Sequence, residues 1–291
     1  MSKLAFIYPG QGAQMAGMGA DFYENSPLSK EIYEEASRVL NLDMKSLCFE
    51  ENDKLNQTEY TQAAMVTTCL AMTKALEAAG ICPDITAGLS LGEYAAIASA
   101  GGMDELDAIL SVRQRGILMQ NTVPRGEGVM AAILGLSSEK IEEVVEPIDG
   151  VTVANYNCPG QIVITGKVKA VEEACLKLKE AGAKRTVSLN VSGPFHSPML
   201  REAREKLLKV LDEVDFHELR IPYVTNVTAG KVINIEETKE LLAEQMCAPV
   251  RWQQSMEAMI ADGVDTFVEI GPGIGTMTQY LACAAREVVA I

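Results

Sequence analysis

The sequence predicts an α/β protein in which a main domain with a largely parallel sheet carries a smaller inserted unit. Three observations lead to this expectation. Short apolar runs typical of strands alternate with helical patterns over much of the chain. A serine stands between two glycines at 88–92, in the G-x-S-x-G frame that joins a strand to a helix. The middle of the chain follows a different order, β-α-β-β-α-β, which is that of a ferredoxin-like unit.

The first part of the chain provides one strand and two long helices. Residues 4–8 are apolar and strand-like, and they end in the glycine-containing loop 9–12. Residues 27–47 and 61–79 have the apolar spacing of helices, with Thr61 as the expected cap of the second. A strand followed by helices is the start expected of an α/β domain.

The serine of the G-x-S-x-G frame lies between the next strand and the next helix. Residues 85–87 form a short apolar run that indicates a buried strand. Residues 93–98 are rich in alanine, and Glu93 falls in the first turn, where a negative charge suits the helix dipole. The two glycines allow the sharp turn on which a nucleophilic serine is held.

After a further helix expected over 104–120, the order of predicted strands and helices changes. The predicted elements from here are a strand at 129–134, a helix at 137–145, strands at 151–155 and 161–165, a helix at 169–181 and a strand at 184–191. We assign residues 125–195 to this unit, and residues 1–124 and 196–291 to the main domain. A cleft is expected where the two meet.

The last part of the chain returns to the main domain. Residues 198–214 predict a long amphipathic helix, and residues 222–227 and 264–270 predict strands. The second of these strands is followed by a Gly-Pro-Gly turn at 271–273. These strands would complete the main sheet.

Composition and charge disfavour several classes of function. The formal charge is −15, and phosphate binding needs a concentrated basic surface, so nucleic acid is not an expected partner. Only two histidines, and seven cysteines without C-x-x-C spacing, disfavour a metal centre, and we expect neither a metal nor a cofactor. No apolar run approaches the ~20 residues that span a bilayer, so we expect a soluble, cytoplasmic protein with no membrane partner. We also expect a monomer.

A serine nucleophile needs a base, and His196 is the candidate for Ser90. It precedes Ser197-Pro198, a pair that predicts a helix N-terminus with Ser197 as cap. Because the positive end of the helix dipole disfavours imidazolium, a neutral imidazole is expected there. The other histidine, His217, lies in a polar segment typical of a solvated position. A histidine packed under a loop is the alternative interpretation of His196.

No acidic residue between the serine and the histidine clearly completes a triad, because most of these acids lie on predicted helices or in the inserted unit. A main-chain carbonyl can orient a histidine without a second charge, and we favour that arrangement.

The Gly10-Gln11-Gly12 loop fails the dinucleotide pattern G-x-G-x-x-G, because Met15 stands at the third glycine position. We expect the loop to bring the N–H of Gln11 beside the N–H of Leu91, where both would hold the oxyanion of an acyl-transfer intermediate. A simple turn after the first strand is the alternative.

Three arginines follow the serine in sequence, at positions 113, 115 and 125. Arg113 and Arg115 are two apart on a predicted helix, so they face different sides. A buried arginine without a protein partner would imply an anionic ligand such as a carboxylate, held by two hydrogen bonds. The spacing does not choose between them.

Several segments together resemble the malonyl-CoA:acyl carrier protein transacylases of fatty-acid synthesis. They occur in the order of that family and cover essentially the whole chain. The segments are 6–14 (FIYPGQGAQ), 88–94 (GLSLGEY), 113–116 (RQRG), 155–161 (NYNCPGQ), 193–197 (GPFHS), 249–252 (PVRW) and 269–273 (EIGPG). For the fold, we expect an α/β-hydrolase-like main domain with the ferredoxin-like subdomain inserted.

The resemblance implies Ser90 as the nucleophile, His196 as the base, and the N–H groups of Gln11 and Leu91 as oxyanion donors. It also selects Arg115 as the clamp on the malonyl carboxylate. A nucleophile, a base and oxyanion donors are what ester formation on a serine requires.

Three further residues receive roles from the same resemblance. Gln245 matches the position whose main-chain carbonyl orients the histidine. Gln62 matches an active-site glutamine, although Ala63 stands where a proline usually follows. Phe195 is similar to the residue of acyltransferases that take malonyl rather than the bulkier methylmalonyl group. One departure is Leu89, where many members have histidine, and we expect it to point away from the nucleophile and alter how the elbow is packed, with the chemistry intact.

The implied reaction is ping-pong transfer of malonyl from malonyl-CoA to the phosphopantetheine thiol of acyl carrier protein, through an ester on the serine. The alternatives are a free-standing acyltransferase of a polyketide pathway, a serine acyl hydrolase, and a non-catalytic module that binds a carrier protein.

Overall fold

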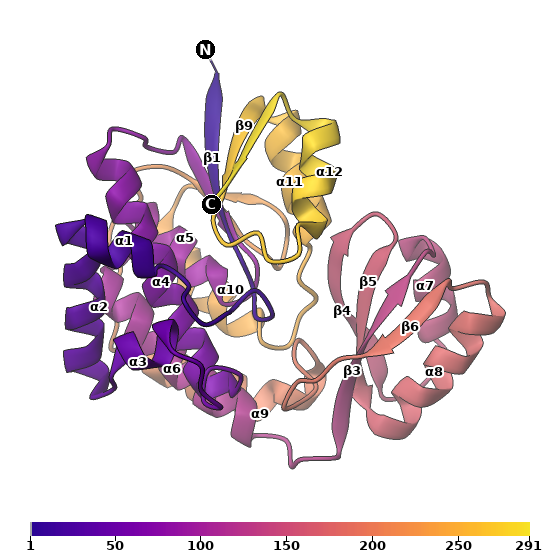
Figure 1. Ribbon diagram of the computed structural model, residues 1–291. Coiled ribbons are helices and arrows are strands. Elements are labelled where there is room, and N and C mark those ends of the chain that lie inside the picture. Colours follow the sequence, from indigo (N-terminus) through magenta and orange to yellow (C-terminus); the bar gives the residue numbers. More distant parts are fainter. Residues whose placement is uncertain (1) are drawn as a thin grey trace.

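Two separate β-sheets organise the computed structural model, which describes residues 2–291. Figure 1 shows a large lobe with many helices, and a smaller lobe that carries the second sheet with two helices. One sheet is mostly parallel and the other is antiparallel. The expected mixed α/β class with a parallel sheet is therefore confirmed.

The main sheet has six strands in the order β10-β9-β1-β2-β7-β8. Their bounds are β1 Lys3–Tyr8, β2 Ile85–Gly88, β7 Tyr223–Val224, β8 Lys231–Val232, β9 Val264–Glu269 and β10 Glu287–Ala290. The strands from β10 to β7 run parallel, and β8 pairs antiparallel at the edge. Tyr8 pairs with Gly88, so the loops that follow β1 and β2 leave the sheet at the same edge.

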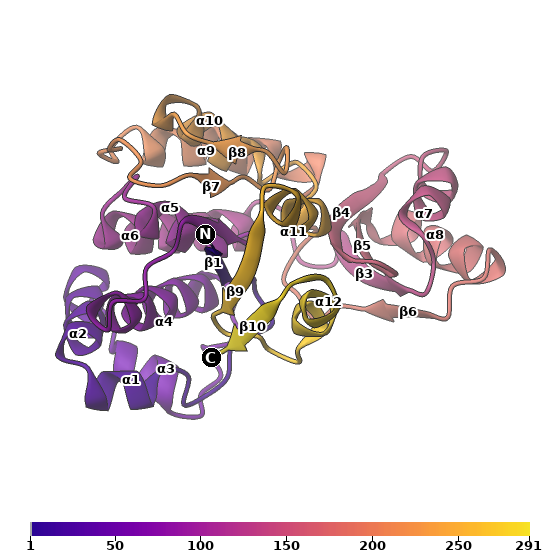
Figure 2. The same ribbon diagram turned by 90° about the horizontal axis from the view of Figure 1, so that it is seen from above.

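Helices cover both faces of this sheet, which explains why β1 is apolar without alternation. Phe6 and Tyr8 belong to the core that includes α4 and α5, whereas Ala5 and Ile7 belong to the core that includes α11 and α12. Figure 2 shows these two pairs of helices on opposite sides of β1 and β9. The helices of this lobe are α1 Ala20–Asn25, α2 Pro27–Leu40, α3 Met44–Phe49, α4 Thr58–Ala78, α5 Gly92–Ser99, α6 Glu105–Asn121, α9 Arg201–Leu211, α10 Thr238–Glu244, α11 Trp252–Ala261 and α12 Thr276–Ala284.

The second sheet has four antiparallel strands in the order β4-β5-β3-β6. Its elements are β3 Gly128–Leu134, α7 Ser138–Val145, β4 Val151–Cys158, β5 Gln161–Lys167, α8 Val168–Glu180 and β6 Arg185–Ser188. Ala131 and Ile133 pack with the two helices, whereas Met130 and Ala132 on the opposite face join the core of the main lobe. This alternation is that of a sheet buried on both faces.

A short backbone bridge joins the two lobes. Asn155 on β4 forms a parallel bridge with Val250, which precedes α11. The Tyr156 N–H donates to the Val250 carbonyl at 2.9 Å, and the Val250 N–H donates to the Ala154 carbonyl at 2.8 Å. Main-chain hydrogen bonds therefore fix the spacing of the lobes at this point.

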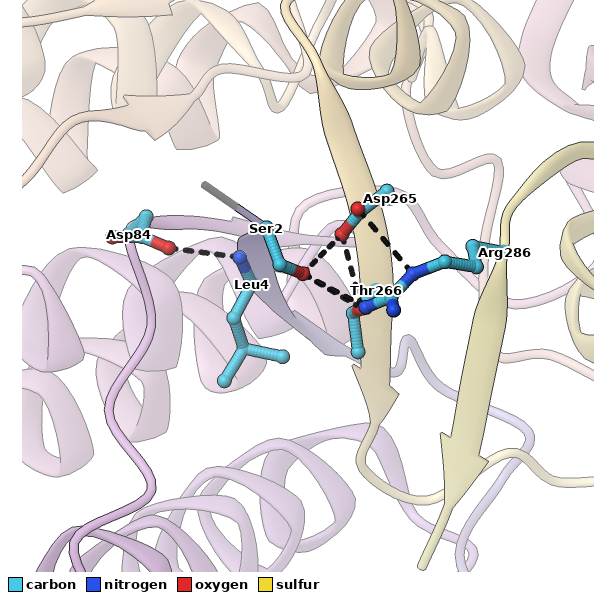
Figure 3. A network of polar contacts seen from close by, with 6 residues as sticks. All are labelled: Ser2, Leu4, Asp84, Asp265, Thr266 and Arg286. Carbon is cyan, nitrogen blue, oxygen red and sulfur yellow. Dashed lines mark hydrogen bonds and ion pairs between the residues drawn. The ribbon is translucent and has the colours of Figure 1, made fainter.

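The amino end of the main sheet carries an exposed polar network (Figure 3). Its members are Ser2, Leu4, Asp84, Asp265, Thr266 and Arg286. The Leu4 N–H donates to Asp84 at 2.8 Å, and Arg286 pairs with Asp265 at 3.3 Å. These contacts tie the start of β1 to the segments before β2, within β9 and before β10, at the end of the sheet opposite to the loops after β1 and β2.

Two expectations about helix boundaries are wrong. The pattern over 27–47 is two helices, because Asn41 adopts a left-handed conformation with φ of 50° and ends α2. Thr61 does not cap α4, since that helix begins at Thr58; its hydroxyl donates to the Leu55 carbonyl instead. Among the described residues, none of the helices is long and apolar enough to cross a membrane.

Candidate active site

Ser90 lies on a strained turn between β2 and α5, with a left-handed φ of 55°. The chain passes so close to itself here that a Cβ on Gly88 would lie 1.9 Å from the carbonyl carbon of Gly92. A Cβ on Gly92 would lie 2.6 Å from the carbonyl oxygen of Pro9. Both glycines of the G-x-S-x-G frame are therefore required by close backbone approach.

Asn226, which follows β7, holds this turn from the neighbouring strand. Its Oδ1 accepts the Ser90 N–H at 2.6 Å, and its Nδ2 donates to the Gly88 carbonyl at 2.6 Å. Because it is fully buried, losing either bond would leave an unsatisfied backbone group. Asn226 is not among the residues predicted from the sequence, because the expected strand 222–227 includes it, whereas β7 ends at Val224 and leaves Asn226 on the turn that follows.

His196 contacts the serine and is oriented from behind. Its Nε2 lies 2.8 Å from Ser90 Oγ, and its Nδ1 lies 2.7 Å from the main-chain oxygen of Gln245. A carbonyl can only accept, so Nδ1 carries the proton and Nε2 is free to accept the serine proton. The structure thus brings these three predicted residues together.

Burial, and next the positive charge of Arg115, lower the pKa of His196 to about 3. This low pKa agrees with the expected neutral imidazole, and its leading cause is burial. The residues after His196 form a short 3-10 turn, Pro198–Leu200, and Ser197 does not cap it: its hydroxyl donates to the Pro194 carbonyl at 2.7 Å.

Arg115 is fully buried directly behind the nucleophile. Its Nη1 donates to Gln62 Oε1 at 2.7 Å, and its Nη2 donates to Gln245 Oε1 at 2.8 Å and to Ser90 Oγ at 3.0 Å. Its Nε is buried without a partner, and within residues 2–291 its hydrogen bonds go to neutral oxygens. Burial lowers the pKa of this guanidinium.

Arg113, the other arginine on the same helix, has different surroundings. It pairs with Glu59 at 2.9 Å and lies over the ring of Tyr60 at the edge of the lobe. The two arginines therefore separate as their spacing predicts, and burial selects Arg115 as the one beside the serine.

A cavity of about 420 Å³ opens in front of Ser90, between the two lobes. Its main-lobe wall includes Gln11, Gln62, Leu91 and His196, and Phe195 lines it where the two lobes join. Its small-lobe wall includes Met130, Asn155, Asn157, Gln161, Val163, Leu189 and Val191. The cleft expected between the two units is therefore present, and it contains the predicted serine and histidine.

Two further predicted residues occupy the loop and turn beside the serine. Gln11 lies on the loop after β1, with its side chain donating to Thr58 Oγ1 at 3.2 Å, and Leu91 follows Ser90 at the start of α5. Leu89, before the serine, packs against this loop, where a Cβ on Gly10 would lie 2.3 Å from its Cδ2. Leu89 thus supports the loop that carries Gln11.

Glu93 is a second functional candidate that the sequence analysis did not identify. It is fully buried in the first turn of α5, and its Oε2 accepts from Gln245 Nε2 at 2.6 Å and from the Asn226 N–H at 3.1 Å. Burial raises the pKa of Glu93 to about 7. The available signal was an acid in a helix whose other residues are all uncharged, and the pattern alone relates that acid only to the helix dipole.

The chain has close relatives among known proteins. Residues 5–288 match the family model described as the acyl transferase domain. A Bacillus subtilis (strain 168) protein named malonyl CoA-acyl carrier protein transacylase is 46% identical over 278 residues, which cover 94% of this chain and 88% of that protein.

Two solved structures extend the similarity to the fold. An acyl carrier protein S-malonyltransferase from Vibrio cholerae is 39% identical with a TM-score of 0.95, over 100% of this chain and 97% of that one. A malonyl-transacylase solved in complex with a type II PKS acyl-carrier protein is 36% identical with a TM-score of 0.95, over 100% and 96% of the two chains.

Proposed function

This chain belongs to the acyl transferase domain family, and from that premise we propose that it transfers malonyl from malonyl-CoA to the phosphopantetheine thiol of an acyl carrier protein in fatty-acid biosynthesis. Relatives that match almost the whole chain are named malonyl CoA-acyl carrier protein transacylase or acyl carrier protein S-malonyltransferase. One relative was solved together with an acyl-carrier protein, which supports a carrier protein as the partner here.

The first half-reaction forms a malonyl ester on the serine. His196 Nε2 accepts the Ser90 proton as Oγ attacks the thioester carbonyl, and the N–H groups of Gln11 and Leu91 hold the oxyanion. The C–S bond then breaks, and His196 returns its proton to the sulfur, so that CoA leaves as a thiol.

The second half-reaction reverses these steps with another thiol. The phosphopantetheine thiol gives its proton to His196 and attacks the ester carbonyl. The bond to Ser90 Oγ breaks, and His196 protonates the serine as malonyl leaves on the carrier. The scheme balances with thiols and imidazole alone, and it calls for no metal or cofactor.

Arg115 is the group proposed to recognise the malonyl carboxylate. It is charged and buried, and the described part of the chain gives it only neutral hydrogen-bond partners, so a substrate carboxylate can supply the missing counter-charge. Gln62, on the neighbouring helix, holds one arm of the guanidinium. Phe195 is buried in the cavity wall and is proposed to limit the size of the acyl group.

One observation carries this proposal: Ser90 Oγ lies within hydrogen-bond distance of both His196 Nε2 and Arg115 Nη2. A hydrolase or esterase needs the first contact and has no use for a buried cation at the second. A carboxylated acyl group explains both contacts together.

Mass spectrometry after brief exposure to malonyl-CoA tests the proposal. We expect a malonyl ester on Ser90 that disappears when holo acyl carrier protein is added, as the carrier gains the same group. Ser90→Ala should give neither product. Release of free malonate at the same rate with and without carrier would identify a hydrolase instead, and a preference for polyketide over fatty-acid carriers would place the protein in a polyketide pathway.

We also propose finer descriptions of the lobes. The order β4-β5-β3-β6, all antiparallel with two helices on one face, supports a ferredoxin-like subdomain over 125–195. The parallel sheet with Ser90 on a strand-to-helix turn supports an α/β-hydrolase-like core over 1–124 and 196–291. A monomer in the cytoplasm stays a prediction.

A further inference from the structure

We propose that Glu93 is a positioning residue for malonyl recognition: it fixes the amide of Gln245 so that this side chain holds Arg115 behind Ser90. This inference rests on the function proposed above. Glu93 itself does not line the cavity, and its proposed effect is on which acyl group is selected.

The geometry begins with the two ends of one buried amide. Gln245 Nε2 donates to Glu93 Oε2 at 2.6 Å, and Gln245 Oε1 accepts from Arg115 Nη2 at 2.8 Å. Glu93, Gln245 and Arg115 are each 1% exposed or less, so water does not replace a lost bond. The three side chains thus form a continuous line from the elbow helix to the guanidinium.

The chemistry of these groups permits only one orientation of the amide. Glu93 Oε2 accepts N–H donors from both Gln245 and Asn226, so it selects the Nε2 end of Gln245 whether or not the other carboxyl oxygen carries a proton. The Ser90 carbonyl, which also accepts from Gln245 Nε2 at 2.9 Å, selects the same end. A flipped amide would place an NH2 group against the guanidinium and an oxygen against the carboxylate. Both contacts would then be repulsive and both groups unsatisfied, which is costly in a buried site.

Glu93 also supplies charge without occupying the guanidinium. Its carboxylate raises the pKa of Arg115 through space and so favours the charged form, in opposition to burial. Because an amide separates the two groups, Arg115 keeps hydrogens that a direct ion pair would use. The place for a substrate carboxylate therefore stays open, and the hydrogen bond to Gln245, which Glu93→Gln also provides, is what positions Arg115.

The other buried glutamine provides an internal comparison. Gln62 Oε1 also accepts from Arg115, but its Nε2 donates to the sulfur of Met119 at 3.4 Å, which is a weak acceptor. The Gln245 amide is therefore held by Glu93 at 2.6 Å, with the Ser90 carbonyl at 2.9 Å and Asn226 Oδ1 at 3.3 Å as further acceptors, whereas the Gln62 amide is held by a thioether. We expect the Glu93 contact to dominate the position of Arg115.

Glu93 has a second contact that a purely structural role would explain, because it accepts the Asn226 N–H and Asn226 holds the turn at Ser90. Disturbing that turn would impair Ser90 towards every acyl group. Disturbing Gln245 and Arg115 would slow the transfer of malonyl, the carboxylated acyl group, more than the transfer of acetyl. The ratio of malonyl to acetyl transfer separates the two roles.

The experiment compares Glu93→Leu, which removes the acceptor, with Glu93→Gln, whose Oε1 can accept both bonds made by Glu93 Oε2. Acylation of Ser90 is followed by mass spectrometry with malonyl-CoA and with acetyl-CoA. We expect Glu93→Leu to lose malonyl acylation at least tenfold more than acetyl acylation. Glu93→Gln should keep the malonyl-to-acetyl ratio within about threefold of the wild-type ratio.

Arg115→Ala provides the reference, and adding Glu93→Leu to it should leave the ratio unchanged, because the two residues act through the same contact. Thermal melting checks folding, and Glu93→Ala replaces the leucine variant if that variant does not fold. Equal loss for both acyl groups, an unaffected leucine variant, or a glutamine variant as poor as the leucine one would each overturn the inference.

The assay reads the ester on Ser90 and does not need a carrier protein. Failure to pass malonyl onward would therefore count against the proposed function, and an unchanged acyl ratio would count against the role of Glu93.

Discussion

The two ends of the main sheet carry polar networks of opposite character. At the amino end, the network of Figure 3 joins Ser2, Asp265 and Arg286 in exposed positions. At the carboxyl end, Ser90, Glu93 and Arg115 lie in a network in which almost every group is buried. Exposed contacts exchange readily with water, whereas buried ones have no substitute. The position of a network in the fold therefore decides how much a single substitution costs.

The largest effect expected from this comparison is that of His196→Ala. Without the imidazole, the remaining partner of Ser90 Oγ among residues 2–291 is the Arg115 guanidinium, a cation that cannot accept a proton. We expect the rate of malonyl transfer to fall by about 10³-fold or more, with the fold intact. Steady-state transfer assays with a circular dichroism control check this. A fall of less than tenfold in this rate would show that His196 is not the base.

Arg115→Ala should give the next largest effect, and a selective one. We expect malonyl transfer to fall roughly 10²-fold, because a charged hydrogen bond pair to the acyl carboxylate is lost. Acetyl transfer should fall much less. Competition between malonyl-CoA and acetyl-CoA measures the ratio directly, and an equal loss of both would contradict the clamp.

Glu93→Gln should change the pH dependence of stability. Burial raises the pKa of Glu93 from 4.5 to about 7, so over this window the folded protein keeps a proton that the unfolded chain releases. The contribution of Glu93 to stability is full at low pH and is lost as the pH rises through about 7. The glutamine variant does not ionise. Its free energy of unfolding should therefore increase relative to that of the wild type by roughly 1 to 3 kcal/mol as the pH rises through this range. Urea denaturation at pH 5 and pH 8 tests this, and a pH-independent difference would exclude it.

Arg286→Ala at the amino end should have the smallest effect. Its partners Asp265, Thr266 and Ser2 are accessible to water, which replaces the lost hydrogen bonds. We expect a change in Tm below about 2 °C and no change in malonyl transfer. A large loss of activity would mean that the two ends of the sheet are coupled, and the comparison would then fail.

The sequence predicts the reacting residues better than their supports. Ser90 stands in a local frame, and only two histidines compete for the role of base, so both can be named before the structure is known. Asn226 and Glu93 carry no such frame. Asn226 lies 136 positions after Ser90 in the chain, and only the pairing of β2 with β7 places it beside the turn.

Tertiary packing also decides which of two arginines on one helix lies beside the serine, a choice that their spacing in the sequence leaves open. Arg113 and Arg115 are equivalent in the helical pattern, and the packing of α6 on α4 places one at Glu59 and the other behind the serine. Asn41 similarly ends α2 through a left-handed conformation that the apolar pattern does not register. Local patterns indicate elements, whereas their ends and the buried contacts depend on tertiary structure.

The backbone bridge between the lobes has a consequence for protein engineering. The small lobe offers a natural unit for exchange between acyltransferases, because its helices and sheet have their own core. The strand that would have to be transplanted, β4, has register irregularities at Val153/Asn155 and Tyr156/Cys158, and between them it meets Val250. A chimera that preserves the irregularities of β4 should keep the transplanted lobe correctly placed relative to Ser90. A chimera that removes them should place that lobe wrongly relative to Ser90.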